Sequence, residues 1–310
     1  MKSHQIITLT LNPSLDKSTH FTGLIAEQKI RCENPRYDAG GGGINVSKAI
    51  AKLGGNSLCI HTSGGSAGIM LEEIILKDGI ENKVIRTQNW TRENFIAFEN
   101  TTKAQYRFGF PGNELLEDEK QKVIETIKEI NTKYLVLSGS LNEGLPTDFY
   151  QTIAEIAKAM GIKVIVDTSG EPLRKVLEKG VYLIKPNIGE LAKLIGVEKL
   201  ELSEVEKAAK TLIENGAAEI VVVSLGTQGA ILVSKEQIEF VKAPKVTKKS
   251  TVGAGDSMVG GMVWALSQNK TLKEVIQWGV SCGTAATMNE GTQLFKKEDA
   301  MWLFEGLQKR

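Results

Sequence analysis

The sequence predicts an α/β protein built on a mostly parallel β-sheet that helices cover on both faces. Strand-like apolar runs alternate with helical segments along the chain, at residues 6–11, 57–61, 134–138, 163–167, 182–185 and 220–224. Such alternation is typical of parallel strands joined by crossover helices. With 310 residues and 41% hydrophobic content, the chain can bury a full core, either as one large α/β domain with appendages or as two smaller domains.

Two parts of the chain break this alternation. Residues 29–37, and residues 94–100 together with 104–110, alternate polar and apolar side chains without an intervening helix. We therefore expect a small antiparallel sheet inserted into the α/β body. Such a sheet has exposed edges and an apolar face, so it should cover a site, a partner subunit, or both.

Polar residues follow several predicted strands at the point where each strand ends: residues 12–16, 138–140, 167, 185–187 and 224–226. In open α/β sheets the ligand crevice lies at the carboxyl ends of the strands. Residues that are far apart in the sequence are therefore expected to converge there.

Charge and composition exclude several classes of partner. The 38 basic and 37 acidic residues leave a formal charge of +1, and no dense run of Lys or Arg occurs, so neither nucleic acid nor an anionic membrane is an expected partner. No apolar stretch approaches the roughly 20 residues needed to span a bilayer. The histidines are too far apart to bind a transition metal together: His4, His20 and His61.

The cysteines and the N-terminus indicate a reduced compartment. The cysteines are odd in number and widely scattered, at Cys32, Cys59 and Cys282. The first residues lack the apolar run of a signal peptide. We therefore expect a cytoplasmic protein without a disulfide framework.

The most informative stretch is residues 250–261, where Gly253 and Gly255 precede Asp256 and an apolar segment that predicts a helix beginning near Ser257. Glycines let backbone N–H groups turn toward an anion, and the helix N-terminus adds positive dipole charge. A carboxylate at that place suits a base that takes a proton from an attacking hydroxyl. A strand-to-helix turn in which Asp256 is only an N-cap would have the same sequence.

A second glycine cluster, residues 40–43, precedes Asn45 at the opening of a predicted helix. Four consecutive glycines indicate close approach of a backbone to a ligand, or alternatively a flexible hinge. Asn45 offers both a donor and an acceptor to a polyol. Asp16, just beyond the first strand, could accept hydrogen bonds from vicinal hydroxyls or could cap a turn.

Asn187 and Glu190 are three residues apart at the start of a helix, so both can face one spot. A hydrated magnesium ion bound through few protein ligands fits that spacing, and so does a helix capping box. The turn at residues 224–229 follows an apolar run and resembles a nucleotide-cradling turn, although a hairpin would look similar.

Three cationic residues, Arg92, Arg107 and Lys29, belong to the predicted inserted sheet or its approaches. They could solvate the surface or bind a substrate phosphate. Two absences restrict the nucleotide-binding motif: no Gly-Lys dipeptide occurs, which excludes a Walker A loop, and no glycine cluster completes G-x-G-x-x-G after a strand.

Three motifs carry a family resemblance. Gly-Gly-Gly-Gly-Ile-Asn-Val at 40–46, Lys-Pro-Asn-Ile-Gly-Glu-Leu at 185–191 and Ser-Thr-Val-Gly-Ala-Gly-Asp-Ser-Met-Val-Gly at 250–260 resemble the PfkB branch of the ribokinase family, nearly end to end. Residues 89–94, 105–108 and 166–171 are further similar to its minor, second-type bacterial 6-phosphofructokinases.

The resemblance implies one ribokinase-like domain over residues 1–310, with a β-sheet lid from about 17–38 and 91–110 that doubles as the interface of a homodimer. It implies MgATP-dependent phosphorylation of a hexose phosphate. The reaction expected from it converts fructose 6-phosphate, at its C1 hydroxyl, to fructose 1,6-bisphosphate with release of ADP.

The resemblance also implies roles for residues. Asp256 would be the general base, beside an anion hole of Gly253, Ala254 and Gly255. The sugar would contact Asp16, Gly40, Gly41, Asn45 and Ser140, and its phosphate would contact Arg92, Arg107 and a neighbouring subunit's Lys29. ATP would contact Lys185, Asn187, Ser224, Gly226 and Gly229, with Glu190 ordering Mg²⁺ through water. K⁺ would bind near Ser250, Val252, Ala286, Asn289 and Gly291.

Two departures from the family pattern bear on the substrate. Relatives acting on fructose 1-phosphate or tagatose 6-phosphate commonly have Lys where this chain has Gly42, which favours fructose 6-phosphate. Asn142 and Glu143 replace an expected Pro-Pro pair after Ser140. Tagatose-6-phosphate kinase is the nearest alternative, followed by 1-phosphofructokinase. A non-catalytic sugar-phosphate sensor is the alternative from another class.

Overall fold

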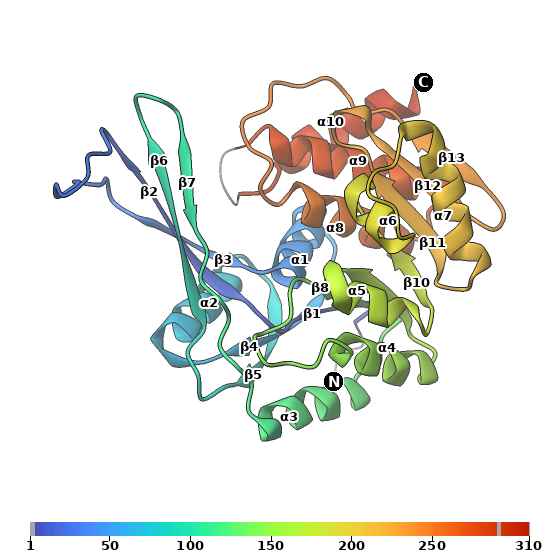
Figure 1. Cartoon of the computed structure of the whole chain (residues 1–310), viewed down its shortest axis with the longest axis horizontal. Helices are drawn as coiled ribbons and strands as arrows, with labels where there is room; N and C mark the ends of the chain where they lie inside the picture. The colour runs from blue at the N-terminus through green and yellow to red at the C-terminus, as the bar shows by residue number, and fades with distance from the viewer. Residues whose placement is uncertain (1–3, 290–292, 310) are drawn as a thin grey trace.

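The computed structural model describes residues 4–289 and 293–309 and contains a large and a small β-sheet (Figure 1). The large sheet has nine strands in the order β13-β12-β11-β10-β9-β8-β1-β4-β5. Pairing is parallel from β5 through β11 and antiparallel from β11 to β13. Its strands are β1 Ile6–Thr10, β4 Leu58–Ser63, β5 Glu81–Arg86, β8 Tyr134–Ser138, β9 Lys163–Asp167, β10 Val181–Ile184, β11 Ala218–Ser224, β12 Ala230–Ser234 and β13 Ile238–Val241.

The predicted strands of the body are all present, within one or two residues at their ends. The sequence did not indicate β5 and β13, and it indicated β12 only through the hairpin that was one alternative for residues 224–229. Residues of β5 are mostly exposed or half-buried at the edge of the sheet, so its sequence lacks the apolar run of a buried strand. By contrast, Val221, Val222 and Val223 of β11 are fully buried, because helices cover both faces there.

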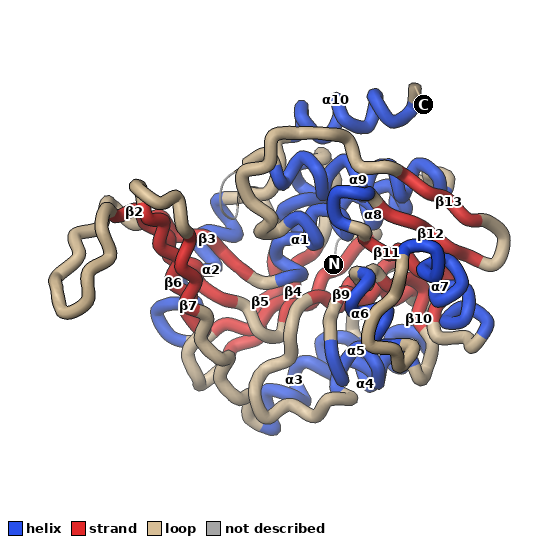
Figure 2. Tube along the Cα trace, turned by 45° about the horizontal axis from the view of Figure 1, so that its top comes forward, coloured by secondary structure: helices blue, strands red, loops and turns tan. Residues whose placement is uncertain are grey.

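Helices form a layer on each face of the large sheet (Figure 2). One hydrophobic cluster packs beneath α3 to α7, and another beneath α1, α8, α9 and α10, with α2 and α1 sharing a third. The helices are α1 Gly42–Lys52, α2 Gly65–Lys77, α3 Glu117–Lys128, α4 Phe149–Ala159, α5 Gly170–Leu177, α6 Ile188–Leu194, α7 Val205–Glu214, α8 Ala254–Ser267, α9 Leu272–Thr287 and α10 Lys297–Gln308, with 3₁₀ turns η1 Leu202–Glu204 and η2 Gly226–Gln228. In the part of the chain that the structure describes, no helix is both long and apolar enough to cross a membrane.

The small sheet, which we call the lid, projects from one side of the body (Figures 1 and 2). Its strand order is β3-β2-β6-β7, with β2 Ser14–Phe21, β3 Arg36–Gly40, β6 Arg92–Glu99 and β7 Gln105–Phe108. The two outer pairings are antiparallel, but the central strands β2 and β6 pair in parallel. Both central strands leave the body from the same sheet edge, after β1 and β5, and therefore run outward together.

Two predictions about the lid are wrong. The sheet is mixed rather than antiparallel, because of the β2–β6 pair. Residues 29–35 belong to no strand, although Cys32 makes an isolated bridge with Phe21. The first lid strand is instead β2, which begins at Ser14 and contains Asp16. Polar residues such as Asp16 and Lys17 obscured its alternating pattern.

Candidate functional site

The turn around Asp256 lies where α8 begins. Gly253 is the N-cap residue in the left-handed region (φ 71°), and the helix runs from Ala254, so Asp256 belongs to its first turn. The helix thus starts three residues earlier than the sequence predicted, and Asp256 is not its N-cap. The first-turn amides have no intrahelical acceptors, and their N–H groups carry the positive end of the helix dipole. This backbone is suited to bind an anion.

One of the two glycines of the turn has a steric reason. A Cβ on Gly253 would lie 2.4 Å from the Leu294 side chain, and its positive φ disfavours other residues. A Cβ on Gly255 would lie 3.5 Å from Lys185 Nζ. This is an ordinary contact distance, so Gly255, which is exposed, lies beside Lys185 with room for a small side chain.

Three charged or polar side chains lie near the Asp256 carboxylate. Asn45 Nδ2 donates to Asp256 Oδ2 at 2.8 Å, and Lys185 Nζ forms an ion pair with Asp167 Oδ1 at 3.3 Å. Burial, together with the negative charge of Asp167, raises the pKa of Asp256 to about 6, against the hydrogen bond from Asn45 and the charge of Lys185. Asp256 is therefore suited to accept a proton near neutral pH.

Lys185 is buried at the end of β10 and stays charged. Burial lowers the pKa of Lys185, but the carboxylates of Asp167, Asp256 and Glu190 outweigh that effect and raise it. Three carboxylates therefore surround one cation beside the α8 turn. Asp167 was noted in the sequence only as a polar residue at a strand end; its pairing with Lys185 follows from the adjacency of β9 and β10.

The glycines at 40–43 pack tightly against strand ends rather than forming a loose hinge. A Cβ on Gly42 would lie 2.3 Å from Ser138 Oγ, and one on Gly43 would lie 2.6 Å from Thr10 Oγ1. Gly41, with φ 124°, is the N-cap residue of α1. The sequence predicted that this backbone would lie close to a ligand, but at Gly42 and Gly43 it lies close to protein atoms instead. This packing brings α1 and Asn45 to the edge of the sheet.

Asn45 keeps one hydrogen-bonding atom free. Its Nδ2 donates to Asp256, whereas its buried Oδ1 has no partner among the described residues. A buried, unpaired carbonyl oxygen is costly unless a ligand supplies a donor. A hydroxyl group placed beside Asp256 would supply one.

Asp16 lies in strand β2 of the lid and not in a turn, so it is not a turn cap. Its Oδ1 accepts from Ser14 Oγ at 2.7 Å and from Asn94 Nδ2 at 2.8 Å. Its Oδ2 lies where a Cβ on Gly40 would come within 2.5 Å. Burial raises the pKa of Asp16, and the two hydrogen bonds oppose this effect. Ser14 and Asn94 were not predicted, because their roles follow from the β2–β6 register.

The lid register places the predicted phosphate-binding arginines on one face. Ser14 pairs with Arg92, Asp16 with Asn94, and Ile96 with Arg107, and paired residues project from the same face of a sheet. The lid also borders a cavity of about 430 Å³, lined by residues of the lid and the body that include Asp16, Ile96, Phe98, Lys249 and Lys296. A larger cavity of about 780 Å³ lies at the amino ends of β9 to β11, away from these residues.

Arg92 and Ser140 are both held near Asn12. Arg92 donates to the carbonyl oxygens of Asn12 and Phe110, each at 3.2 Å, and its buried Nε has no partner among the described residues. Ser140 Oγ accepts from Asn12 Nδ2 at 3.1 Å. Arg107 is exposed. Lys29 is also exposed, in the β2–β3 connection at the end of the lid away from the body (Figure 1), so it does not join the Asp256 cluster of its own chain.

The segment predicted to bind ATP forms both of the local structures that the sequence left open. Asn187 and Glu190 make a capping box at the start of α6, with reciprocal hydrogen bonds of 2.9 Å. Residues 224–229 form the β11–β12 hairpin around η2, with Leu225 N donating to Gly229 O at 2.8 Å. Ser224 bridges to Asn187, so the hairpin and the α6 N-terminus lie side by side. Gly226 and Gly229 have positive φ values that the turn requires.

The loop predicted to bind a monovalent cation lies against the end of α9. Lys249 N and Ser250 N donate to Thr287 O, at 2.7 and 3.3 Å, and Val252 N donates to Ser250 Oγ at 3.1 Å. Asn289 N donates to Ala286 O at 3.2 Å. The carbonyl end of a helix attracts cations. Gly291, predicted as a further ligand, lies outside the described residues.

Comparison with known proteins identifies the family. The sequence profile of the pfkB family of carbohydrate kinases matches residues 9–299. The chain therefore belongs to the pfkB family of carbohydrate kinases. A relative from Escherichia coli strain K12, the ATP-dependent 6-phosphofructokinase isozyme 2, is 41% identical over 302 residues, which are 97% of this chain and 98% of the relative.

Comparison with solved structures supports the same family. The fold matches that of phosphofructokinase-2 from Escherichia coli in complex with potassium (TM-score 0.95, 41% identity) and in complex with fructose-6-phosphate (TM-score 0.93, 39% identity), each comparison covering 98% of this chain and 99% of the other.

Relatives with other substrates are less similar in sequence. A 1-phosphofructokinase from Borreliella burgdorferi is 35% identical over 91% of this chain and 92% of the relative. A tagatose-6-phosphate kinase from Staphylococcus epidermidis is 32% identical over 93% of both. The predicted ribokinase-like fold and kinase class are confirmed.

Replacing Asp256 by Asn should stabilise the fold at neutral and alkaline pH. Folding raises the pKa of Asp256 from 3.8 to about 6, so its ionisation costs stability above about pH 6 and costs little below the unfolded value. We expect Asp256→Asn to raise the free energy of unfolding by about 1–3 kcal/mol near pH 8 and to lose most of that gain near pH 4. Thermal unfolding at both pH values measures this. A lower Tm for the variant near pH 8 would contradict it.

Proposed function

We propose that this protein transfers the γ-phosphoryl group of ATP to the C1 hydroxyl of fructose 6-phosphate, giving fructose 1,6-bisphosphate and ADP. The observation that carries the proposal is the Asp256 carboxylate in the first turn of α8, hydrogen-bonded to Asn45 and with its pKa raised to about 6. The similarity to 6-phosphofructokinase isozyme 2 from Escherichia coli supports the same reaction.

Asp256 takes the proton of the C1 hydroxyl as the hydroxyl oxygen forms its bond to the γ-phosphorus. The bond between that phosphorus and the bridging oxygen breaks, and ADP leaves with the electron pair. The backbone of Gly253, Ala254 and Gly255, at the N-terminus of α8, stabilises the negative charge on the transferred group. Because phosphoryl transfer needs mainly positioning and electrostatic stabilisation, these groups suffice for the protein's part of the step.

The sugar is bound by side chains from both the lid and the body. Asp16 and the unpaired Oδ1 of Asn45 offer acceptors to its hydroxyls. Gly40 lies against Asp16, and Gly41 O accepts a hydrogen bond from Asn45 N. Ser140 completes the contact, held by Asn12. The non-reacting phosphate is bound by Arg92, by Arg107 and by Lys29 of the partner subunit.

ATP lies along the ends of β10 and β11, in contact with Lys185, Asn187, Ser224, Gly226 and Gly229. Glu190 uses one carboxylate oxygen in its capping box, which leaves the other for water. No cluster of three or more metal-binding side chains occurs among the described residues, so Mg²⁺ would be held by phosphates, water and Glu190. When bound, it neutralises charge on the phosphates. Among the described residues, K⁺ would be held by carbonyl groups of Ser250, Val252, Ala286 and Asn289.

At Gly42 this chain departs from the pattern of kinases that act on the two alternative substrates. The lysine that relatives acting on fructose 1-phosphate or tagatose 6-phosphate commonly carry there would place its Cβ within 2.3 Å of Ser138 Oγ in this backbone. A non-catalytic sensor would have no use for a base at Asp256. A coupled assay of ADP release across hexose phosphates tests the proposal, and kcat/KM for fructose 6-phosphate against tagatose 6-phosphate decides between the closest substrates. Greater kcat/KM for tagatose 6-phosphate would overturn it.

Asp256→Asn should fold and bind its ligands while kcat falls by about 10²- to 10⁴-fold, the usual effect of removing a general base. Steady-state rates with saturating substrates measure the loss, and circular dichroism serves as the control for folding. Turnover close to that of the wild type would exclude Asp256 as the base.

Arg107→Ala should mainly raise KM for the sugar phosphate, because contact with a non-reacting phosphate is equally strong in the ground and transition states. KM for ATP should change little. To test whether Arg107 contacts the phosphate, kcat/KM of the variant and of the wild type is measured with fructose 6-phosphate and with fructose. An equal loss for both sugars would show that Arg107 does not contact the phosphate.

A shared site predicts complementation between two inactive chains. Phe108 is 52% exposed and Leu24 is 53% exposed on the lid and its connection, which supports pairing of two lids in a symmetric dimer. A heterodimer of Asp256→Asn and Lys29→Ala chains should regain activity at the one site in which Asp256 and the partner's Lys29 are both intact. A fully active monomer by light scattering, or verified heterodimers without activity, would contradict the shared site.

A further inference from the structure

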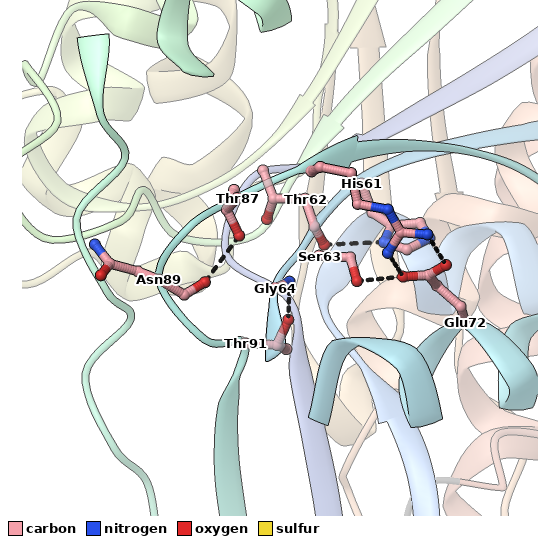
Figure 3. Close-up of polar contacts among 9 residues, drawn as sticks. His61, Thr62, Ser63, Gly64, Glu72, Thr87, Asn89 and Thr91 are labelled. Atoms are coloured by element: carbon pink, nitrogen blue, oxygen red, sulfur yellow. Dashed lines mark hydrogen bonds and ion pairs between the residues drawn. The ribbon is translucent and has the colours of Figure 1, made fainter. Parts of the chain in front are cut away.

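The chain enters β6 of the lid through residues 87–91, which are bound to the turn between β4 and α2 (Figure 3). Thr87 N donates to Ser63 O at 2.9 Å, and Thr91 N donates to Gly64 O at 2.8 Å. Gly64 N in turn donates to Thr91 Oγ1 at 3.1 Å. Thr91 is thus held by two reciprocal hydrogen bonds immediately before Arg92, the first residue of β6.

Three glycines let this segment lie directly on the turn. A Cβ on Gly64 would lie 2.0 Å from Asn89 O, and one on Gly68 would lie 2.9 Å from Thr91 Oγ1. A Cβ on Gly65 would lie 2.5 Å from the ring of Trp90. Any displacement of the turn is therefore transmitted to residues 89–91 by direct contact.

Glu72 of α2 holds the turn in place. Its carboxylate accepts a hydrogen bond from the buried hydroxyl of Ser63 (Figure 3). It also forms a bidentate pair with Arg86, whose Nη2 lies 2.9 Å from Oε2. The Glu72 side chain is 14% exposed and the Arg86 side chain is 66% exposed, so the carboxylate is shielded from solvent whereas the guanidinium is not. Since Ser63 ends β4 and Arg86 ends β5, Glu72 joins the two strand ends from which the turn and the segment 87–91 emerge.

The bonds of Arg92 extend this connection to the other strands that cross between body and lid. Its guanidinium donates to Asn12 O, before β2, and to Phe110 O, after β7. Thr62, next to Ser63, donates through Oγ1 to Leu11 O at 2.7 Å. The end of β4 therefore contacts the entry to β2 directly and the entry to β6 through Thr91.

We propose that Glu72 is a positioning residue for the sugar-phosphate site: by fixing Ser63, Gly64 and Thr91, it sets the orientation of Arg92 and of the lid. This inference rests on the proposed function, in which Arg92 binds the non-reacting phosphate. Glu72 itself touches no substrate. Its replacement by Gln is informative because Gln has one acceptor oxygen in place of two. Arg86 contacts both oxygens of Glu72, so one of its N–H groups would face an amide donor in either orientation of the Gln side chain.

The first experiment compares Glu72→Gln with Glu73→Gln, which makes the same change at an exposed neighbour on α2. In Glu72→Gln, KM for fructose 6-phosphate should rise by roughly 3- to 10-fold while KM for ATP stays within about twofold. The preference for fructose 6-phosphate over fructose in kcat/KM should fall by the same factor. Adding Glu72→Gln to Arg92→Ala should then cause little further loss. An equal loss for fructose and fructose 6-phosphate, or full additivity with Arg92→Ala, would overturn the proposal.

The second experiment does not depend on catalysis. Hydrogen exchange of residues 87–92 should be faster in Glu72→Gln than in the wild type and unchanged in Glu73→Gln, because the Thr91 amide loses protection when the turn moves. Unchanged exchange would overturn the positioning role even in an active enzyme. Absence of activity of the wild type on any hexose phosphate would instead refute the proposed function.

A further pair of variants serves if Glu72→Gln fails to fold. Thr91→Val removes the acceptor of the Gly64 amide, whereas Thr91→Ser keeps it. The valine variant should reproduce the raised KM for fructose 6-phosphate and the faster exchange, and the serine variant should restore values within about twofold of the wild type. Identical behaviour of the two variants would contradict a role for this hydrogen bond.

Discussion

The ion pair of Lys185 with Asp167 organises the site, because both charges are largely withdrawn from water and each needs the other. Their strands, β10 and β9, are neighbours in the sheet, so the pair forms at the carboxyl edge where α8 begins. Besides burial, Asp167 raises the pKa of Asp256 and Lys185 lowers it, so the proton affinity of Asp256 depends on both members of the ion pair. Removing either partner would leave an uncompensated buried charge beside Asp256.

The glycines before α1 and the glycine before α8 are required for different physical reasons. At Gly42 and Gly43, tight contact with Ser138 and Thr10 brings the start of α1, and with it Asn45, to the sheet edge. At Gly253 the positive φ turns the chain into α8. Asn45 and Asp256 are thus brought to 2.8 Å from positions 211 residues apart in the sequence. Two helix N-termini meet there, and both favour negative charge.

Sequence patterns predicted the parallel sheet, the lid and most strand ends, because a strand buried on both faces leaves a continuous apolar run such as Ile220 to Val223. They failed where tertiary contacts decide the structure. Strand β5 is an edge strand with few buried residues, and β2 carries Asp16 and Lys17 within its pattern. Asn94 and Asp167 received no role because their partners, Asp16 and Lys185, become visible only with the register of β2–β6 and the order of β9 and β10.

The parallel pairing of β2 and β6 makes the lid a lever arm. Each of these strands has eight residues and joins the body at its inner end. At about 3.3 Å per residue, the arm is roughly 26 Å long, so a tilt of about 10° at its root moves the tip by about 4–5 Å. A displacement too small to break any contact at Thr91 would therefore carry the β2–β3 connection, with Lys29, across the width of a side chain. A small displacement at the inner end of the lid therefore becomes a larger displacement at its outer end.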